Sequence, residues 1–306
     1  MFDKRLQSIK DHEVYIMKIG VCTSAENIKI VEDIGFDYIE PSVVGIAEMK
    51  ENEFERIVRM VDVSSIKCES FNVMFPRYIK LAGPEVDMNE IESYLKEAFS
   101  RITVLGAKIV VLGSGGARRI PDGYNREDAW NQLVQAVRTI GDIAAGYGLT
   151  VAVEPLNKSE TNIINSVEEG LKFVRDVDHA NIKITADFYH MRRENEPMDV
   201  LIQAGKDIAH LHIANSNGRV YPMDPSEDAY DAFFDALKKA GYQARVSVEA
   251  GVRGRSAIFQ SGWKAVKCRG MSGPSSSATQ RVSAPSSASE SLRPGISRVV
   301  ISNHTV

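Results

Sequence analysis

Four segments in the second half of the chain place a carboxylate or an imidazole at or near the end of an apolar run. Burying a carboxylate without a charged partner or a metal is costly, because the charge loses its hydration. None of these run ends contains Lys or Arg. Acidic groups repeated in this way therefore indicate a shared cation. The segments are Val151-Ala152-Val153-Glu154, Ile184-Thr185-Ala186-Asp187, Ala209-His210-Leu211-His212 and Val246-Ser247-Val248-Glu249.

One divalent cation would neutralise three carboxylates and accept one neutral imidazole. Oxygen-rich ligation with a single nitrogen suits Mn²⁺, which we favour, or Mg²⁺, with Co²⁺ as a further alternative. A structural zinc site would favour Cys and more His. Either His210 or His212 can be the imidazole on spacing alone, because residues two apart on a strand point to the same side.

The elements that must position these groups repeat a short apolar run, a polar loop and a helix-patterned segment. Nearly continuous apolar runs such as Ile109-Val110-Val111-Leu112 are typical of parallel strands buried on both faces. Glycines at or just past the expected helix ends, among them Gly35 and Gly205, are stop signals. The predicted strands are 18–23, 38–41, 67–75, 108–113, 149–154, 182–187, 208–213 and 244–249, and the predicted helices are 25–35, 53–63, 88–105, 126–147, 167–176, 198–204 and 228–240.

Eight strands with intervening helices favour an α/β fold of the (β/α)8 TIM-barrel type over an open doubly wound sheet. The first strand carries no Gly-x-Gly-x-x-Gly and no Gly-Lys-Ser, which weakens the phosphate-loop alternatives. In such a barrel the active-site groups lie at the carboxyl ends of the strands. The four acidic and imidazole groups should then meet at one rim.

The eighth helix of this barrel is not found in the sequence. We expect an N-terminal extension over 1–16, a TIM-barrel catalytic domain over 17–251 and an atypical, Ser-rich, basic and disordered tail over 252–306. Two hypotheses explain the tail: a frameshift or fusion near residue 252, or a natural disordered extension.

Charge is distributed unevenly along the 306 residues. Residues 251–306 hold eight Lys/Arg and one acid, Glu290, which leaves 29 basic and 40 acidic residues in the rest of the chain. This acidic body is a poor electrostatic match for nucleic acid or an anionic membrane. The start of the chain does not read as a secretory signal. The three cysteines form neither a metal clip nor a disulfide framework, so we expect a cytoplasmic protein.

Four motifs resemble the D-tagatose 3-epimerase and D-psicose 3-epimerase group and, more broadly, the sugar isomerase/epimerase families of xylose-isomerase-like barrels. The resemblance covers about residues 17 to 251. It is specific for the superfamily and much less so for the substrate. The motifs are Glu154-Pro155-Leu156-Asn157, Asp187-Phe188-Tyr189-His190-Met191, His210-Leu211-His212 and Val248-Glu249-Ala250-Gly251.

The resemblance implies that Glu154, Asp187, His212 and Glu249 are the metal ligands, with His210 behind them or in the core. Glu154 and Glu249 would also be catalytic, taking and returning a proton from opposite faces of a metal-stabilised enediolate.

Substrate-contacting positions of the epimerase group match Glu160, His190 and Arg219. The alternatives are a solvated loop acid for Glu160 and a structural histidine for His190. Asn215-Ser216-Asn217-Gly218 stands where epimerases usually carry a Glu, a departure that bears on sugar specificity.

Weaker candidates lie on the same rim. Glu40, Asn72 and Phe75 end the second and third predicted strands, and the Gly-rich loop 114–119, with Arg118 and Arg119, could hold a phosphate or be a tight turn with solvated bases. We expect Trp130 to pack rather than bind sugar. Cys22 and Cys68 are expected in the core.

The predicted function is a metal-dependent isomerase or epimerase of a sugar or sugar phosphate, with ketose 3-epimerase favoured. An inosose dehydratase-like lyase and a nonfunctional truncated barrel are the alternatives. An apurinic endonuclease shares the barrel but is disfavoured by six His and an acidic body. A small-molecule sugar is the expected partner, with no nucleic acid, no membrane and homo-oligomer formation left open.

Overall fold

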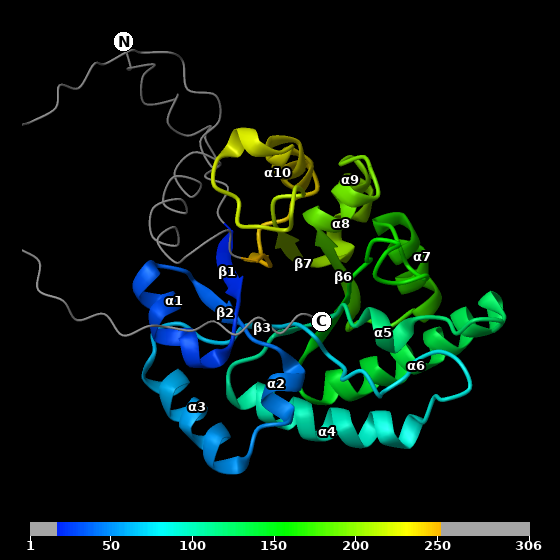
Figure 1. Ribbon diagram of the computed structural model, residues 1–306, viewed down its shortest axis with the longest axis horizontal. Helices are drawn as coiled ribbons and strands as arrows, with labels where there is room; N and C mark the ends of the chain where they lie inside the picture. The colour runs from blue at the N-terminus through cyan, green and yellow to red at the C-terminus, as the bar shows by residue number, and fades with distance from the viewer. Residues whose placement is uncertain (1–16, 252–306) are drawn as a thin grey trace, which may run out of the picture. The chain divides into compact units, whose positions relative to one another are not determined.

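A computed structural model describes residues 17–251, in which eight parallel strands form a nearly closed barrel. Neighbouring strands pair in the order β2-β1-β8-β7-β6-β5-β4-β3. Figure 1 shows the strands at the centre with the helices around them. The predicted (β/α)8 fold is therefore confirmed. The strands are β1 (Lys18–Cys22), β2 (Tyr38–Glu40), β3 (Ser70–Phe71), β4 (Ile109–Leu112), β5 (Thr150–Val153), β6 (Ile182–Asp187), β7 (Ile208–Ile213) and β8 (Arg245–Val248).

The seam between β2 and β3 closes without a continuous ladder. The strand predicted over 67–75 was too long, since only Ser70–Phe71 form a strand, which pairs with β4. Val73 takes a left-handed φ of 45°, which turns the chain out of the sheet. An isolated parallel bridge joins Ser42 to Asn72, and the Asn72 N–H donates to the Pro41 carbonyl at 3.0 Å. This isolated bridge and hydrogen bond therefore join the segments after β2 and β3, where a regular ladder would otherwise continue.

Most helices lie where the periodicity predicted them. Gly35 (φ 94°) ends α1 and Gly205 (φ 46°) ends α9, as expected of stop glycines. Of the four short helices, α9 lies within the predicted helix 198–204, whereas α2, α5 and α8 were missed, because so few residues show no helical period. The longer helices are α1 (Ile28–Ile34), α3 (Glu51–Val63), α4 (Met88–Val104), α6 (Arg126–Gly146), α7 (Val167–Val177) and α10 (Tyr230–Lys239), and the short ones are α2 (Val43–Ala47), α5 (Gly115–Arg118), α8 (Phe188–Arg193) and α9 (Val200–Ala204).

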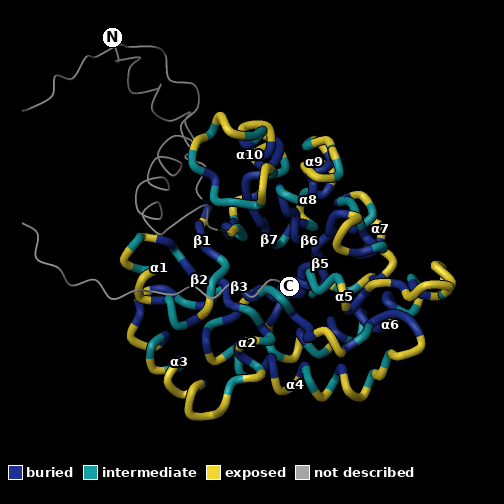
Figure 2. The backbone as a smooth tube through the Cα atoms, viewed as in Figure 1, coloured by how far each residue is buried: buried dark blue, intermediate teal, exposed yellow. Residues whose placement is uncertain are grey.

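The core fills the barrel and the layer between strands and helices. All four residues of β4 are buried, as the continuous apolar run predicted for a strand covered on both faces. Figure 2 shows buried strands and exposed residues on the outer sides of α3 and α4. Trp130 packs edge-on against Phe173, with 5.2 Å between ring centroids, and its Nε1 donates to Asp176 at 2.8 Å. Trp130 is a packing residue, as expected.

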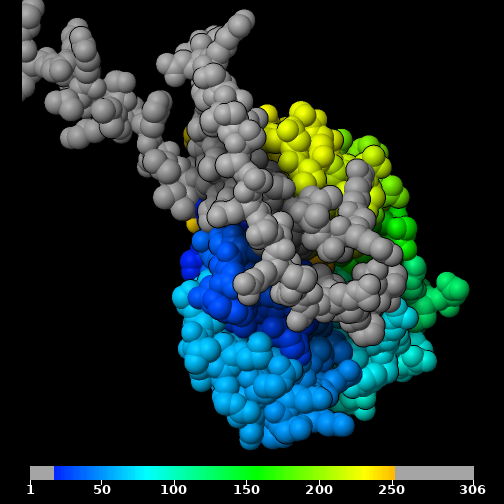
Figure 3. Space-filling view, turned by 60° about the vertical axis from the view of Figure 1, so that its left-hand side comes forward, coloured from blue at the N-terminus to red at the C-terminus, as the bar shows by residue number. Residues whose placement is uncertain are grey.

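The two ends of the described chain meet in the sheet. β1 pairs with β8 in parallel, from Lys18 opposite Arg245 to Val21 opposite Val248. In Figure 3 the blue surface near the start of the barrel and the yellow surface near its end are visible on one face. No helix follows β8 within residues 17–251. The predicted extension 1–16 and tail 252–306 lie outside the described residues, so those domain boundaries remain predictions.

None of the described helices is both long enough and apolar enough to cross a membrane.

Candidate metal centre

Four side chains from successive strand ends converge at one place. Ligand-type atoms of Glu154, Asp187, His212 and Glu249 all lie within 4.8 Å of one another. The register explains part of this convergence, because Asp187 lies opposite His212 across β6 and β7, with an irregularity in the ladder after Ile184. Glu154 directly follows β5 and Glu249 directly follows β8. The structure brings together the four residues proposed as ligands.

His212 stands at the middle of this group. Its Nδ1 lies 2.8 Å from Glu154 Oε1, 3.4 Å from Glu249 Oε2 and 3.9 Å from Asp187 Oδ2. Burial alone would lower the pKa of the His212 imidazole, but the surrounding carboxylates raise it well above its ordinary value. Nδ1 therefore faces the three carboxylates of Glu154, Asp187 and Glu249.

This donor set fits one divalent cation. Glu154 and Asp187 are 4% and 2% exposed and Glu249 is partly buried, so three acidic groups share a site with little access to water. Burial raises the pKa of Glu154, and the neighbouring carboxylates raise it further. A cation among these oxygens and the one imidazole nitrogen would relieve that repulsion.

Arg219 reaches the centre from the loop after β7. Its Nη2 contacts Glu249 Oε2 at 2.7 Å and its Nη1 contacts Glu160 Oε1 at 3.3 Å. Burial would raise the pKa of Glu249, but Arg219 and His212 outweigh burial and hold it well below its usual range. The guanidinium carbon also lies 4.9 Å from the ring centroid of Tyr189. A left-handed φ of 49° at Arg219 indicates local backbone strain held by these contacts.

His190 presents an N–H beside the centre. Its Nδ1 accepts from the Asn157 backbone N–H at 3.2 Å and from Asn157 Nδ2 at 2.9 Å, so the proton of a neutral ring sits on Nε2. That Nε2 lies 3.9 Å from Asp187 Oδ2 and 4.0 Å from Glu160 Oε2, and it has no hydrogen-bond partner among residues 17–251. A buried donor left open between two acidic side chains is suited to a ligand oxygen. The role of Asn157 was not predicted, although this residue ends the motif Glu154-Pro155-Leu156-Asn157.

The Gly-rich loop after β4 does not form the phosphate site that the sequence suggested through Arg118. This side chain is fully buried, with Nη1 donating to the Leu112 carbonyl at 3.2 Å and Nη2 to the Glu154 carbonyl. The guanidinium is thus committed to the backbone at the ends of β4 and β5, while Arg119 is exposed. A Cβ on Gly113 would stand 2.2 Å from Glu154 Oε2. Arg118 therefore holds the backbone of Glu154, and the missing side chain of Gly113 leaves room for the Glu154 carboxylate. Neither residue is placed to bind a phosphate.

Phe75, Cys68 and Cys22, the remaining weak candidates, are not among the four clustered residues. Phe75 is 3% exposed and packs against Tyr94. Burial raises the pKa of Cys68 to about 12, as expected for a core thiol. Cys22 is only partly buried and lies opposite Glu40 in the sheet register, so the expectation of a core position is met by Cys68 alone.

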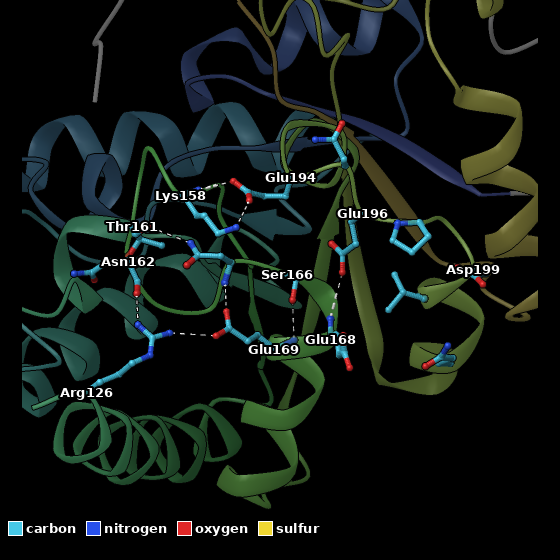
Figure 4. A pocket seen from close by; sticks show the side chains of 15 residues that line it. Arg126, Lys158, Thr161, Asn162, Ser166, Glu168, Glu169, Glu194, Glu196 and Asp199 are labelled. Atoms are coloured by element: carbon cyan, nitrogen blue, oxygen red, sulfur yellow. Dashed lines mark hydrogen bonds and ion pairs between the residues drawn. The ribbon is translucent and has the colours of Figure 1, made fainter.

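A separate polar cavity of about 950 Å³ lies beside α7. Figure 4 shows several of its charged side chains engaged with one another or with backbone. Arg126 pairs with Glu169 at 3.2 Å and Lys158 pairs with Glu194 at 2.9 Å. Glu196 Oε1 accepts from the Val167 N–H at 2.7 Å, at the start of α7. None of the four clustered residues lines this cavity.

Comparison with known proteins places the barrel in a family. A D-psicose 3-epimerase of Ruminiclostridium cellulolyticum is 32% identical over 130 residues, 42% of this chain and 44% of that protein, so the match spans less than half of the relative. A 3-dehydro-D-guloside 4-epimerase of Escherichia coli is 30% identical over 250 residues, 78% of this chain and 93% of that protein. A crystal structure of D-psicose 3-epimerase in the presence of D-fructose superposes with a TM-score of 0.67 at 22% identity, covering 81% of this chain and 89% of that one. A family model described as "Xylose isomerase-like TIM barrel" matches residues 28–266, and the chain belongs to this family.

Proposed function

We propose that this chain is a divalent-metal-dependent sugar isomerase or epimerase, with 3-epimerisation of a ketose as the favoured reaction. One observation carries the proposal: Glu154, Asp187, His212 and Glu249 converge within 4.8 Å at the rim of a barrel. The matched relatives are a D-psicose 3-epimerase and a 3-dehydro-D-guloside 4-epimerase. Both names describe inversion of configuration at a sugar carbon.

The metal would be held by Nδ1 of His212 and by the carboxylates of Glu154, Asp187 and Glu249. We favour Mn²⁺ because the donor set is three carboxylates and one nitrogen. When bound, the ion would supply Lewis-acid polarisation of a sugar carbonyl and an adjacent hydroxyl.

Proton transfer falls to Glu154 and Glu249. Arg219 and His212 hold Glu249 ionised against the effect of burial, whereas burial favours the protonated form of Glu154. Two carboxyl groups with opposed pKa shifts can divide the roles of acceptor and donor. We propose that one takes the proton from the carbon beside the carbonyl and the other returns a proton to the opposite face, with roles exchanged in the reverse reaction.

His190, Glu160 and Arg219 would orient the sugar. The open Nε2–H of His190 can donate to a substrate oxygen, and Asn157 keeps the proton on that nitrogen. Glu160 and Arg219 contact each other at 3.3 Å and can bind hydroxyl groups from the loop side. Such contacts contribute positioning rather than proton transfer.

The test is a panel of ketoses and ketose phosphates incubated with Mn²⁺ in D₂O and followed by NMR. Exchange of the C3 proton with inversion is the expected result. Proton transfer between C1 and C2 would identify an aldose–ketose isomerase, and loss of water a dehydratase. If none of the three reactions occurs although the protein melts cooperatively, the proposal is overturned. If the protein does not melt cooperatively, the truncated, nonfunctional barrel is favoured.

The cytoplasmic location and homo-oligomer formation remain predictions.

A further inference from the structure

Glu40 is a fully buried carboxylate at the end of β2 that the proposed reaction does not use. Its Oε1 accepts from His212 Nε2 at 2.8 Å, and its Oε2 accepts from His210 Nε2 at 2.8 Å and from Ser247 Oγ. Its only ion-pair partners in the described chain are the two histidines. A buried carboxylate needs such donors to offset the loss of hydration. The surroundings of Glu40 are therefore built to keep a negative charge in one place.

This arrangement decides which nitrogen of His212 is free. An ionised carboxylate only accepts hydrogen bonds, so the Nε2 that faces Glu40 carries a hydrogen. In a neutral imidazole the other nitrogen then has the lone pair, and that nitrogen is Nδ1, which faces Glu154, Asp187 and Glu249. Metal-bound histidines usually donate their second ring N–H to such a partner, which fixes the ring and its tautomer.

We propose that Glu40 is a positioning residue of the metal centre, acting through His212 to hold the ring with Nδ1 toward the carboxylates. The inference rests on the proposed function, since it assumes that His212 ligates a metal. It goes further by assigning a role to a residue of the other half of the barrel.

The network behind Glu40 is itself held in place. Tyr38 and Ser247 share a hydrogen bond of 2.6 Å between their hydroxyls, and Ser247 in turn donates to Glu40. The Tyr38 ring occupies the space beside Gly20, where a Cβ would come within 2.3 Å of ring carbons. His210 fixes the second carboxylate oxygen. Glu40 thus has little freedom to turn away from His212.

A competing interpretation is a second metal site, because Cys22, Glu40 and His212 also lie within 4.8 Å of one another. The contacts argue against it. Glu40 already accepts three hydrogen bonds, and His212 presents an N–H rather than a lone pair on that side. The proposal therefore predicts one tightly bound ion per chain, and Cys22 should be dispensable for binding it.

The experiment measures Mn²⁺ binding to the full chain by titration calorimetry and by the electron paramagnetic resonance signal of free Mn²⁺. Glu40→Gln keeps the size of the side chain, but its amide can accept from only one imidazole and presents N–H to the other. Loss of such an outer partner costs about 10- to 100-fold in metal affinity, and we expect that loss here. Ser247→Ala removes one donor to Glu40 and no hydrogen bond to the His212 side chain, so we expect a smaller loss of affinity than for Glu40→Gln. Cys22→Ser should leave one ion per chain.

The outcomes separate the two proposals. If the unaltered chain binds no Mn²⁺, the proposed function fails. If it binds one ion and Glu40→Gln binds equally well, the positioning role is wrong; if Cys22→Ser reduces two ions to one, the second-site interpretation replaces it. Should Glu40→Gln not fold, the role of Glu40 can still be tested by nitrogen NMR of the Mg²⁺-loaded unaltered chain, which shows which ring nitrogen of His212 carries the proton. A protonated Nε2 on His212 supports the role of Glu40, and a deprotonated Nε2 overturns it.

Discussion

The two halves of the barrel contribute differently to the candidate centre. The strand ends of β5 to β8 supply all four clustered groups: Glu154, Asp187, His212 and Glu249. The end of β2 and the short helix α5, which follows β4, supply residues that contact those groups: Glu40 bonds to His212, and Arg118 bonds to the Glu154 backbone carbonyl. In the proposed mechanism one half carries the chemistry and the other half helps to hold it in position.

This division has a physical basis. Acidic groups gathered at one rim repel each other, so their geometry depends on fixed hydrogen bonds from neighbours. Arg118 and Glu40 supply such bonds while being fully buried. Changes in the half with the four groups should therefore abolish the reaction, and changes in the supporting half should weaken it.

Removal of the metal should have the largest effect. Treatment with EDTA is expected to abolish turnover, because the proposed reaction needs Lewis-acid polarisation of the carbonyl. Mn²⁺ or Co²⁺ added in excess should restore it, as measured by the C3 exchange assay. Activity that is indifferent to chelation would contradict the metal centre in the carboxyl-terminal half.

Glu154→Gln and Glu249→Gln come next. Each substitution alters a residue proposed both as a ligand and as a proton carrier, and general acid–base catalysis alone is worth about 10²- to 10⁴-fold. We expect kcat to fall by at least that much for either variant. Glu194→Gln, which breaks an ion pair with Lys158 away from the centre, is the control and should keep its rate. Near-normal kcat in Glu154→Gln or Glu249→Gln would remove that residue from the proposed mechanism.

A substitution in the supporting half should have an intermediate effect. In Gly113→Ala the new methyl group would overlap Glu154 Oε2, and the carboxylate must move to make room. A misplaced catalytic group can cost about 10²-fold in rate, and we expect kcat and Mn²⁺ affinity to fall together by up to that amount. Gly116→Ala, three residues further on in α5, meets nothing within 4 Å and is the matched control. Equal rates in both variants would show that Glu154 is not held from β4.

Sequence patterns anticipated the half that carries the chemistry better than the half that supports it. Glu154, Asp187 and Glu249 each end an apolar run, so a strand period and one rule about barrels predicted that they meet an imidazole at one rim. Spacing alone left His210 and His212 open, and only the family resemblance favoured His212. Arg118 looked like a solvated or phosphate-binding base, because nothing in a linear sequence shows that its partners are two backbone carbonyls. The Asn157–His190 pair joins residues 33 apart, and only the fold brings them together.

The smallest expected effect concerns stability away from the centre, at Glu196 beside the cavity of Figure 4. Burial raises the pKa of Glu196 to about 7, although the Val167 and Glu168 N–H groups favour its ionised form. Because this folded-state pKa lies above the unfolded value near 4.5, the charged form costs stability as the pH rises from about 4.5 through 7. Glu196→Gln should therefore gain about 1 kcal/mol in unfolding free energy over the unaltered chain at pH 8, after allowance for partial exposure, and little at pH 5.

Urea unfolding of the variant and of the unaltered chain at the two pH values measures this difference. A Glu196→Gln variant that is less stable at both pH values would mean that the charged cap on α7 outweighs the cost of burial. The turnover assay completes the comparison between the halves. Glu196 touches neither the four groups nor the residues behind them, so its substitution should shift stability and leave kcat unchanged, unlike Gly113→Ala, which should lower kcat.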